Sequence, residues 1–565
     1  MIQKISFQNY KAFERGEIKI KPITILLGAN SVGKSSIINL LLMLQQTANS
    51  TNYKSALRLH GENVSMGECE NIFRNKNTEN NIIISFEFKD SNLKDLLSKQ
   101  LLDDLINILF QPISFLSHFY DEILKNNSED INLKRFLNRR MEISNKVYDS
   151  KKTFLDLYST IEAINTKLND DKSDVVKYYL KSNEIALSNK KLIEALYEFL
   201  TKLREVIKED VFNLSFELQF VKSNKKEDVL KIREMSLIYK DLSVVTVDFT
   251  LNKNNSSYGD INIVSDFINE QDLFDNKIKK EFLSLINFDS TIFSWPPSIN
   301  RNRDLFFGNF NDQKLSLTTY IISIIINRAV SFVRSQFTRE LINHVSPLRA
   351  HPKRYYFLDK SNINTVLDTL DGNSLTEVLK ENDTVRNLVN DWLGRFGLKV
   401  DVSTLQDVIH KLKIHQNTLD LDITDVGFGI SQILPVIVQG FLSFKGSLTM
   451  VEQPEIHLHP KMQADLADLF IDVVKSINNE KKFLLIETHS EYLLRRLRRR
   501  IAEGIISSDD IAIYFVSPPK NVDASSEILE KEVADNGSFE WPEDFYADEL
   551  KKDTTEFIKH LFLKK

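Results

Sequence analysis

Cysteine is almost absent from this sequence, since Cys69 is the only one among 565 residues. A single cysteine excludes a disulfide within the chain and a metal site built from several thiolates, and such scarcity is typical of the reducing cytosol. An excess of positive charge is missing too, because the net charge is −6 and the isoelectric point is about 6.0. Any contact with nucleic acid would therefore need a local basic patch.

Long hydrophobic runs are also missing. The first ten residues lack the apolar core of a signal peptide. The most apolar stretch, residues 320–333, is interrupted by Asn327 and Arg328, so we expect a buried helix that is too short to span a bilayer. These absences predict a cytoplasmic protein with no membrane partner.

The sequence does contain a glycine-rich motif directly after an apolar strand. Residues 23–27 have the pattern of a buried parallel strand, residues 28–35 read G-x-x-x-x-G-K-S, and an apolar helix follows. In this context backbone N–H groups surround phosphates, the lysine neutralises them and the serine hydroxyl binds Mg²⁺. A chance glycine-rich turn is the alternative, and both flanks argue against it. The predicted ATP and Mg²⁺ site comprises Gly28, Asn30, Ser31, Gly33, Lys34, Ser35 and Ser36.

The chain between residues 35 and 427 is far longer than a minimal P-loop core needs, so most of it is expected to be inserted. Residues 82–88, 213–221 and 242–251 alternate apolar and polar side chains, which predicts the strands of a meander. Residues 93–210 have helical spacing. We favour a compact bundle there over a long coiled coil, because no heptad pattern persists.

A second anion-binding segment begins at residue 427. Gly427, Gly429 and Ser431 open an apolar helix, where backbone N–H groups and a hydroxyl can bind phosphate. One P-loop does not need two phosphate sites in one pocket, so this segment is expected to serve the ATP of a partner subunit. A plain glycine-rich helix start remains the alternative.

Acidic residues follow the next two apolar strands. Residues 448–451 precede Glu452, Gln453 and Glu455, and Glu452 is predicted to bind Mg²⁺ together with Ser35. Residues 482–486 precede His489, at the sheet edge where open α/β folds bind ligands. Another metal site, at His457, His459 and His489, is disfavoured because no helical H-x-x-x-H pair is present.

Two arginine-containing segments have open interpretations. Arg349, in Ser346-Pro-Leu-Arg, is either a ligand for an acidic partner or, as we favour, a salt-bridged arginine in a surface turn. Residues 495–500 contain five arginines, which either contact a phosphate backbone or form a solvated face paired with the acidic tail at 540–549.

In this order the elements resemble the ABC-type ATPases grouped with SMC, RecF-like and overcoming-lysogenization-defect (OLD-like) proteins, and above all bacterial AAA family ATPases with an uncharacterised C-terminal domain. The resemblance implies that residues 28–35 are Walker A, 427–432 replace the ABC signature, 452–455 are Walker B and His489 is the switch histidine. It implies a dimer or higher homo-oligomer with ATP between two heads. Residues 344–349, 371–373, 511–515 and 539–545 are similar to the family as well, whereas 93–210 are not.

The resemblance has one departure and one omission. ABC enzymes usually carry Asp-Glu at the end of Walker B, but here the pair is Glu452-Gln453, and an amide orients water without accepting its proton. Glu455 can substitute as the base, so slow hydrolysis is expected. A related branch carries a Toprim nuclease, for which the segment after His489 is too short.

The predicted fold is α/β, a P-loop NTPase of the ABC-ATPase type with a mixed sheet and a large helical insertion. The resemblance suggests an ATPase that gates a separate effector, such as a nuclease, in bacterial antiphage defence. The alternatives are a DNA-binding repair clamp that uses residues 495–500 and a nucleotide-locked scaffold with little turnover. The predicted segments are head pieces at 1–92, 211–260 and 421–500, a helical insertion at 93–210, a helical lobe at 261–420 and a small C-terminal domain at 501–565.

Overall fold

A computed structural model describes most of the chain. The described residues are 2–50, 54–107, 190–222, 228–252, 257–269, 273–294, 316–357, 372–406, 408–416, 418–475, 481–521 and 524–541, with scattered positions in 151–166, at 254 and 367, and in 555–559. Most of the predicted helical insertion, Asp371 of the 371–373 motif and most of the acidic tail lie outside these residues. The chain divides into two compact units, the first comprising Met1–Thr51, Leu57–Ile84 and Arg334–Lys565, and the second Asn52–Ala56 and Ser85–Val333.

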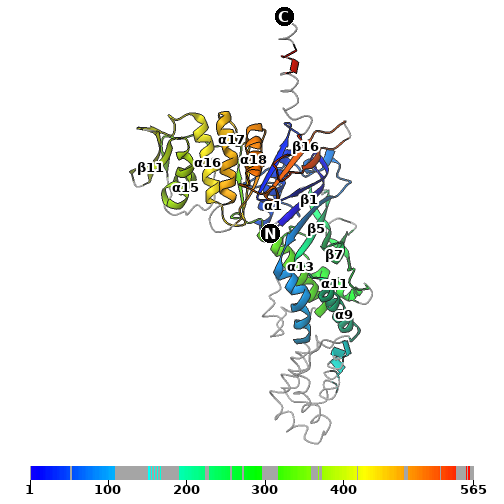
Figure 1. The fold of residues 1–565 in the computed structure, drawn as a ribbon. Coiled ribbons are helices and arrows are strands. Elements are labelled where there is room, and N and C mark those ends of the chain that lie inside the picture. The colour runs from blue at the N-terminus through cyan, green and yellow to red at the C-terminus, as the bar shows by residue number, and fades with distance from the viewer. Residues whose placement is uncertain are drawn as a thin grey trace, which may run out of the picture. The chain divides into compact units, whose positions relative to one another are not determined.

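The first unit is organised around a six-stranded mixed sheet (Figure 1). Its order is β17-β16-β3-β15-β14-β9, with β17 antiparallel and the other five strands parallel. This confirms the predicted α/β P-loop fold. Strands β3 and β15 are buried along their whole length, as expected of apolar strands covered on both faces. The strands are β3 (Ile23–Gly28), β9 (Ile342–Val345), β14 (Leu448–Glu452), β15 (Phe483–Glu487), β16 (Ile511–Ser517) and β17 (Glu527–Lys531).

Helices pack against this sheet through one apolar core that joins Ile25, Val451 and Ile486 to residues of α16, α17 and α18. Helices α15, α16, α17 and α18 follow one another side by side (Figure 1). Pro460 begins α17, a position where its missing N–H costs no helical hydrogen bond. The helices are α1 (Lys34–Ala48), α14 (Asn373–Glu381), α15 (Asp383–Gly394), α16 (Phe428–Leu442), α17 (Pro460–Val474) and α18 (Glu491–Ala502).

Antiparallel strands complete the first unit. β1 (Ile2–Tyr10) pairs with β2 (Phe13–Lys19). β4 (Ile82–Lys89), a strand predicted from its alternation, has residues in both units. A four-stranded sheet occupies part of the region that we expected to be helical. In β12, buried residues alternate with partly exposed ones, the period-two pattern that distinguishes strands from helices. The strands of this sheet are β10 (Tyr356–Phe357), β11 (Leu398–Gln406), β12 (Ile409–Gln416) and β13 (Leu419–Asp422).

The second unit contains an antiparallel meander in the order β5-β6-β7-β8. Two of its strands correspond to the predicted 213–221 and 242–251, whereas β6 was missed. Leu230, Lys231 and Ile232 are buried consecutively in β6, so the strand shows no simple alternation. The elements are α2 (Ser91–Asp95), α9 (Lys190–Val206), β5 (Val211–Val221), β6 (Val229–Tyr239), β7 (Leu242–Leu251), β8 (Tyr258–Val264), α11 (Asn276–Ser284) and α13 (Leu317–Ser335).

Helix α13 corrects one expectation and supports another. Its 19 residues make it long and apolar enough to cross a membrane by length and composition, so the prediction that it is too short is wrong. The predicted burial is correct, because 72% of its most apolar window is buried. The helix continues through Asn327 and Arg328 because they lie on its less buried side, where Arg328 pairs with Asp90 at 3.2 Å.

Candidate functional site

The loop between β3 and α1 has a backbone that only glycine permits at two positions. Gly28 has φ of 143°, and a Cβ atom there would lie 2.3 Å from the carbonyl oxygen of Val516 in β16. Gly33 has φ of 114°, and its Cβ would lie 2.8 Å from the Phe13 ring. Positive φ and close backbone approach are the two conditions that require glycine. These constraints explain the glycine spacing of the motif.

The two polar residues after the loop contact protein oxygens. Lys34 Nζ donates hydrogen bonds to the carbonyl oxygens of Gly28 at 3.1 Å and Ala29 at 2.6 Å, and it lies 3.8 Å from Glu487 Oε1. Ser35 Oγ donates to Glu487 Oε2 at 3.0 Å. Burial lowers the pKa of Lys34, although the charges of Glu487 and Glu455 oppose this shift. Phosphate oxygens would replace these acceptors on nucleotide binding.

A cavity of about 430 Å³ lies over this loop. The predicted ligands that line it are Asn30, Ser31, Gly33, Lys34, Ser35, Ser36 and Gln453. Glu487 lines it too, as do Lys11, Phe73 and Lys76, none of which we predicted as site residues. Lys11 and Phe73 carried no motif signal, because they come from the β1–β2 turn and a loop far from residue 28 in sequence.

Strand order determines where the acidic residues lie. β15 is inserted between β3 and β14, so Glu487 at its end is the register neighbour of Leu26 on one side and Glu452 on the other. Glu452 Oε1 lies 2.7 Å from His344 Nε2 in β9. The predicted Mg²⁺ ligand Glu452 is therefore held by a histidine, and Glu487 is the carboxylate that contacts Ser35.

Glu455 connects Walker B to the loop after β15. Its two carboxylate oxygens accept hydrogen bonds from His489 N at 2.6 Å and Thr488 Oγ1 at 2.8 Å. Burial raises the pKa of Glu455, against these hydrogen bonds and the charge of Arg349, which lower it. With both oxygens engaged, Glu455 positions Thr488 and His489, the loop after β15 that we call the switch loop.

His489 has the environment of a ligand-binding histidine. Its Nε2 atom is buried and makes no hydrogen bond to any described residue. Burial lowers the pKa of His489, and the nearby positive charge of Lys34 lowers it further. A neutral imidazole with an unsatisfied nitrogen can bind a phosphate oxygen through an N–H at that atom. His459 has another role, because its side chain accepts from Lys461 N at the start of α17.

The donor set fits magnesium bound to a nucleotide. Among the described residues there is no group of three or more His, Cys, Asp or Glu side chains that could hold a metal alone. Mg²⁺ in phosphate-binding sites needs only one or two protein oxygens and takes the rest from phosphates and water. Ser35 and a neighbouring carboxylate supply that minimum.

A sequence model of the family described as AAA ATPase domain matches residues 1–494. The chain belongs to this family. It is therefore an ATPase, a class whose members bind ATP. A search of curated proteins found no significant match. Solved structures similar to this ATPase include the SMC head domain from Thermotoga maritima, with 8% identity, coverage of 94% of this chain and 98% of that one, and a TM-score of 0.31. They also include an Smc head domain with an extended coiled coil, bound to the C-terminal domain of ScpA, from Pyrococcus furiosus, with 9% identity, coverage of 94% and 96%, and a TM-score of 0.29.

The signature segment of this ATPase does not line the cavity over the P-loop. Gly427 is exposed, a Cβ atom there would meet nothing within 4 Å, and no side chain caps the start of α16. Gly429 is tightly packed, because its Cβ would lie 2.8 Å from the carbonyl oxygen of His457. Ser431, in the first turn of α16, is buried and lines a small pocket that Tyr356 also lines.

Arg349 joins this segment to Walker B. The bend before it lies at the surface as expected, since Leu348 is 80% exposed, but the Arg349 side chain is 6% exposed and is out of reach of a partner. Its guanidinium donates to the carbonyl oxygens of Gln432, Glu452 and Gln453 at 3.3, 2.9 and 3.4 Å. Burial lowers its pKa to about 10, although the charges of Glu455 and Glu452 oppose the shift.

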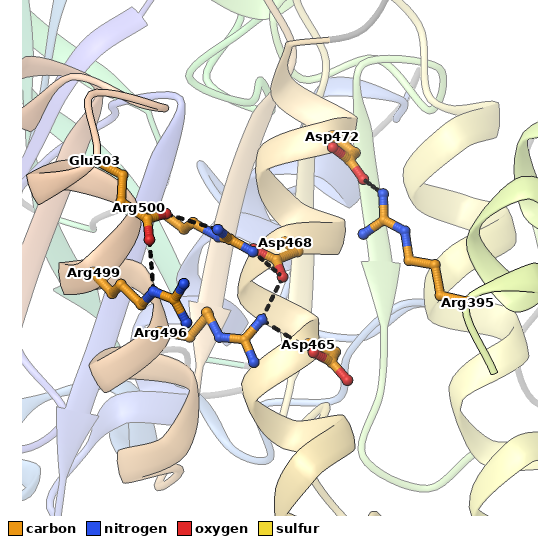
Figure 2. A network of polar contacts seen from close by, with 8 residues as sticks. All are labelled: Arg395, Asp465, Asp468, Asp472, Arg496, Arg499, Arg500 and Glu503. Carbon is orange, nitrogen blue, oxygen red and sulfur yellow. Dashed lines mark hydrogen bonds and ion pairs between the residues drawn. The ribbon is translucent and has the colours of Figure 1, made fainter.

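The arginines of α18 are paired within the ATPase (Figure 2). Arg496 and Arg500 both bind Asp468 of α17, and Arg496 also lies 3.1 Å from Asp465. On the exposed side, Arg495 pairs with Glu491 and Arg499 with Glu503, four residues away in each case. Arg498 donates to the Gly537 carbonyl oxygen. Four of the five arginines thus pair with carboxylates of α17 or at the two ends of α18, and these pairs leave less free positive charge for DNA than the sequence suggested.

Replacing Asp468 with asparagine is expected to lower the free energy of unfolding at neutral pH by about 1–2 kcal/mol, because one part-buried carboxylate serves two arginines. Burial raises the pKa of Asp468, but Arg500 and Arg496 lower it below the ordinary value overall. The stabilisation is therefore present above the unfolded pKa and is lost as the pH falls through the folded one. Urea unfolding across acid and neutral pH measures this, with Asp472→Asn, whose partner Arg395 is exposed, as the milder control. Equal effects of the two variants would contradict the prediction.

Proposed function

We propose that this ATPase is a nucleotide-dependent switch, in which two copies close on ATP and pass that closure to a separate effector, such as a nuclease, in antiphage defence. The proposal rests on the separation of the signature segment from the cavity over the P-loop. The P-loop, Gln453 and Glu487 line one cavity, whereas Gly427 opens a helix on an exposed surface away from it. The site is completed when the signature segment of a second copy covers the cavity. The defence role rests on the family resemblance.

Within one copy, each residue has a definable task. The P-loop amides and Lys34 bind the phosphates, Ser35 offers a hydroxyl to Mg²⁺, and His489, whose buried Nε2 makes no hydrogen bond to a described residue, is available to contact a phosphate oxygen. Bound magnesium would neutralise charge between the β- and γ-phosphates. Gln453 lines the cavity and orients water there without accepting its proton, which supports slow turnover.

The test is steady-state ATP turnover by the full chain, with and without duplex DNA, beside light scattering with and without ATP. Turnover that is lost in Lys34→Ala, together with ATP-dependent dimerisation, supports the proposal. Stimulation by DNA would favour the repair clamp instead. A monomer that stays monomeric in saturating Mg²⁺-ATP would contradict the proposal.

Gln453→Glu is expected to raise turnover by about tenfold or more, because it restores a proton acceptor at the cavity. The measurement is the turnover number at saturating ATP, and Gln453→Ala, which removes the amide without adding a base, serves as the matched control. A Gln453→Glu variant no faster than wild type would show that the base lies elsewhere, with Glu455 as the next candidate.

A further inference from the structure

Three carboxylates gather at the ends of β14 and β15, and their contacts differ. Glu452 is bound to His344, Glu455 to the backbone and hydroxyl of the switch loop, and Glu487 to Ser35. Only Glu487 lines the cavity over the P-loop. It is therefore the carboxylate best placed to face a cation held by Ser35.

The charge balance around Glu487 also favours a cation. The Glu487 side chain is 3% exposed and lies 3.8 Å from the Lys34 ammonium, and Glu452 is its register neighbour on β14. Phosphates that bind the P-loop would compete with Glu487 for the Lys34 ammonium. When Lys34 turns to phosphate, Glu487 loses a partner, and a divalent cation beside Ser35 would replace that positive charge.

We propose that Glu487, rather than Glu452, is the acidic residue that holds magnesium together with Ser35 in the nucleotide complex. Without nucleotide, the same carboxylate holds the Ser35 hydroxyl and lies next to Lys34. Glu452 is a positioning residue fixed by His344 at the neighbouring strand end. The inference rests on the proposed binding of Mg²⁺-ATP and adds the identity of the carboxylate.

The experiment compares the dissociation constant of a fluorescent ATP analogue in EDTA and in excess Mg²⁺ for the full chain. Mg²⁺ is expected to tighten binding to the wild type by about tenfold, the effect of one charge-assisted contact. In Glu487→Gln this gain should fall to about twofold or less, with binding in EDTA retained. Glu452→Gln should keep most of the gain, and the exposed Glu209→Gln should keep all of it.

Two readouts keep the proposal falsifiable if one variant folds poorly. Ser35→Ala removes the other oxygen and should lose the Mg²⁺ gain as Glu487→Gln does. Mn²⁺ titrated in the presence of nucleotide should give a bound paramagnetic signal in wild type and a reduced one in Glu487→Gln. A gain that survives in Glu487→Gln but disappears in Glu452→Gln would overturn the inference while leaving the ATPase function intact. No ATP binding by the wild type, in EDTA or Mg²⁺, would instead refute the proposed function and the inference with it.

Discussion

Lys34→Ala is expected to weaken ATP binding by more than about a hundredfold, which corresponds to about 2.7 kcal/mol of binding free energy. The lysine is 3% exposed, at the base of the cavity, and its ammonium is held there by the carbonyl oxygens of Gly28 and Ala29. It is thus already positioned before nucleotide arrives, and little ordering is needed when the phosphates replace its acceptors. Charge-assisted contacts to phosphate are among the strongest hydrogen bonds in proteins.

The measurement is a titration with a fluorescent ATP analogue in Mg²⁺, with Lys481→Ala as a control of the same type at an exposed position. Thermal unfolding without nucleotide separates a binding defect from a folding defect. A Lys34→Ala variant that binds ATP as tightly as Lys481→Ala would contradict the assignment of residues 28–35 as the phosphate loop.

The fold around the P-loop was predictable because its signals are local. Glycine at 28 and 33 is required by backbone conformation and close contacts, and the strand before it is apolar throughout. The same holds for β14 and β15, each a short apolar run that ends in an acid. The ion pairs Glu491–Arg495 and Arg499–Glu503 could also have been predicted, since side chains four residues apart meet on a helix.

The partners of the acidic residues were not predictable, because they depend on strand order. Nothing in residues 448–490 indicates that β15 lies between β3 and β14, and this insertion brings Glu487 to Ser35. Glu452 was predicted as the metal ligand because it ends a short apolar strand, whereas its contact with His344 comes from β9, more than a hundred residues earlier. Glu487 did carry one signal, an acid at the end of a buried strand.

The burial of Arg349 could not be predicted from the sequence either. A proline-containing turn with an arginine predicts an exposed side chain. Only the tertiary structure shows that three carbonyl oxygens from two distant segments converge on the Arg349 guanidinium. Such an arrangement links the start of α16 to the end of β14. If two copies close on ATP as proposed, the start of α16 would bind the partner's nucleotide and the end of β14 would lie beside the copy's own.

Replacing Arg349 with methionine is therefore expected to lower the free energy of unfolding of the first unit by about 3 kcal/mol and to reduce ATP turnover. Its hydrogen bonds to the carbonyl oxygens of Gln432, Glu452 and Gln453 would be lost, at about 1–3 kcal/mol for each buried acceptor left unpaired. Removing a guanidinium whose pKa is lowered by burial returns part of that cost, so the net effect is smaller than the sum.

The control is Arg354→Met, because Arg354 is close to Arg349 in sequence but is 65% exposed, with an ion pair to Asp425 at 3.8 Å. Chemical unfolding of both variants, followed by ATP-dependent dimerisation, separates stability from coupling. If Arg349 connects the two segments, Arg349→Met at a temperature where it remains folded should bind ATP through an intact P-loop yet dimerise poorly, since the start of α16 is no longer fixed to Walker B. Dimerisation equal to that of Arg354→Met would limit Arg349 to a structural role within one copy.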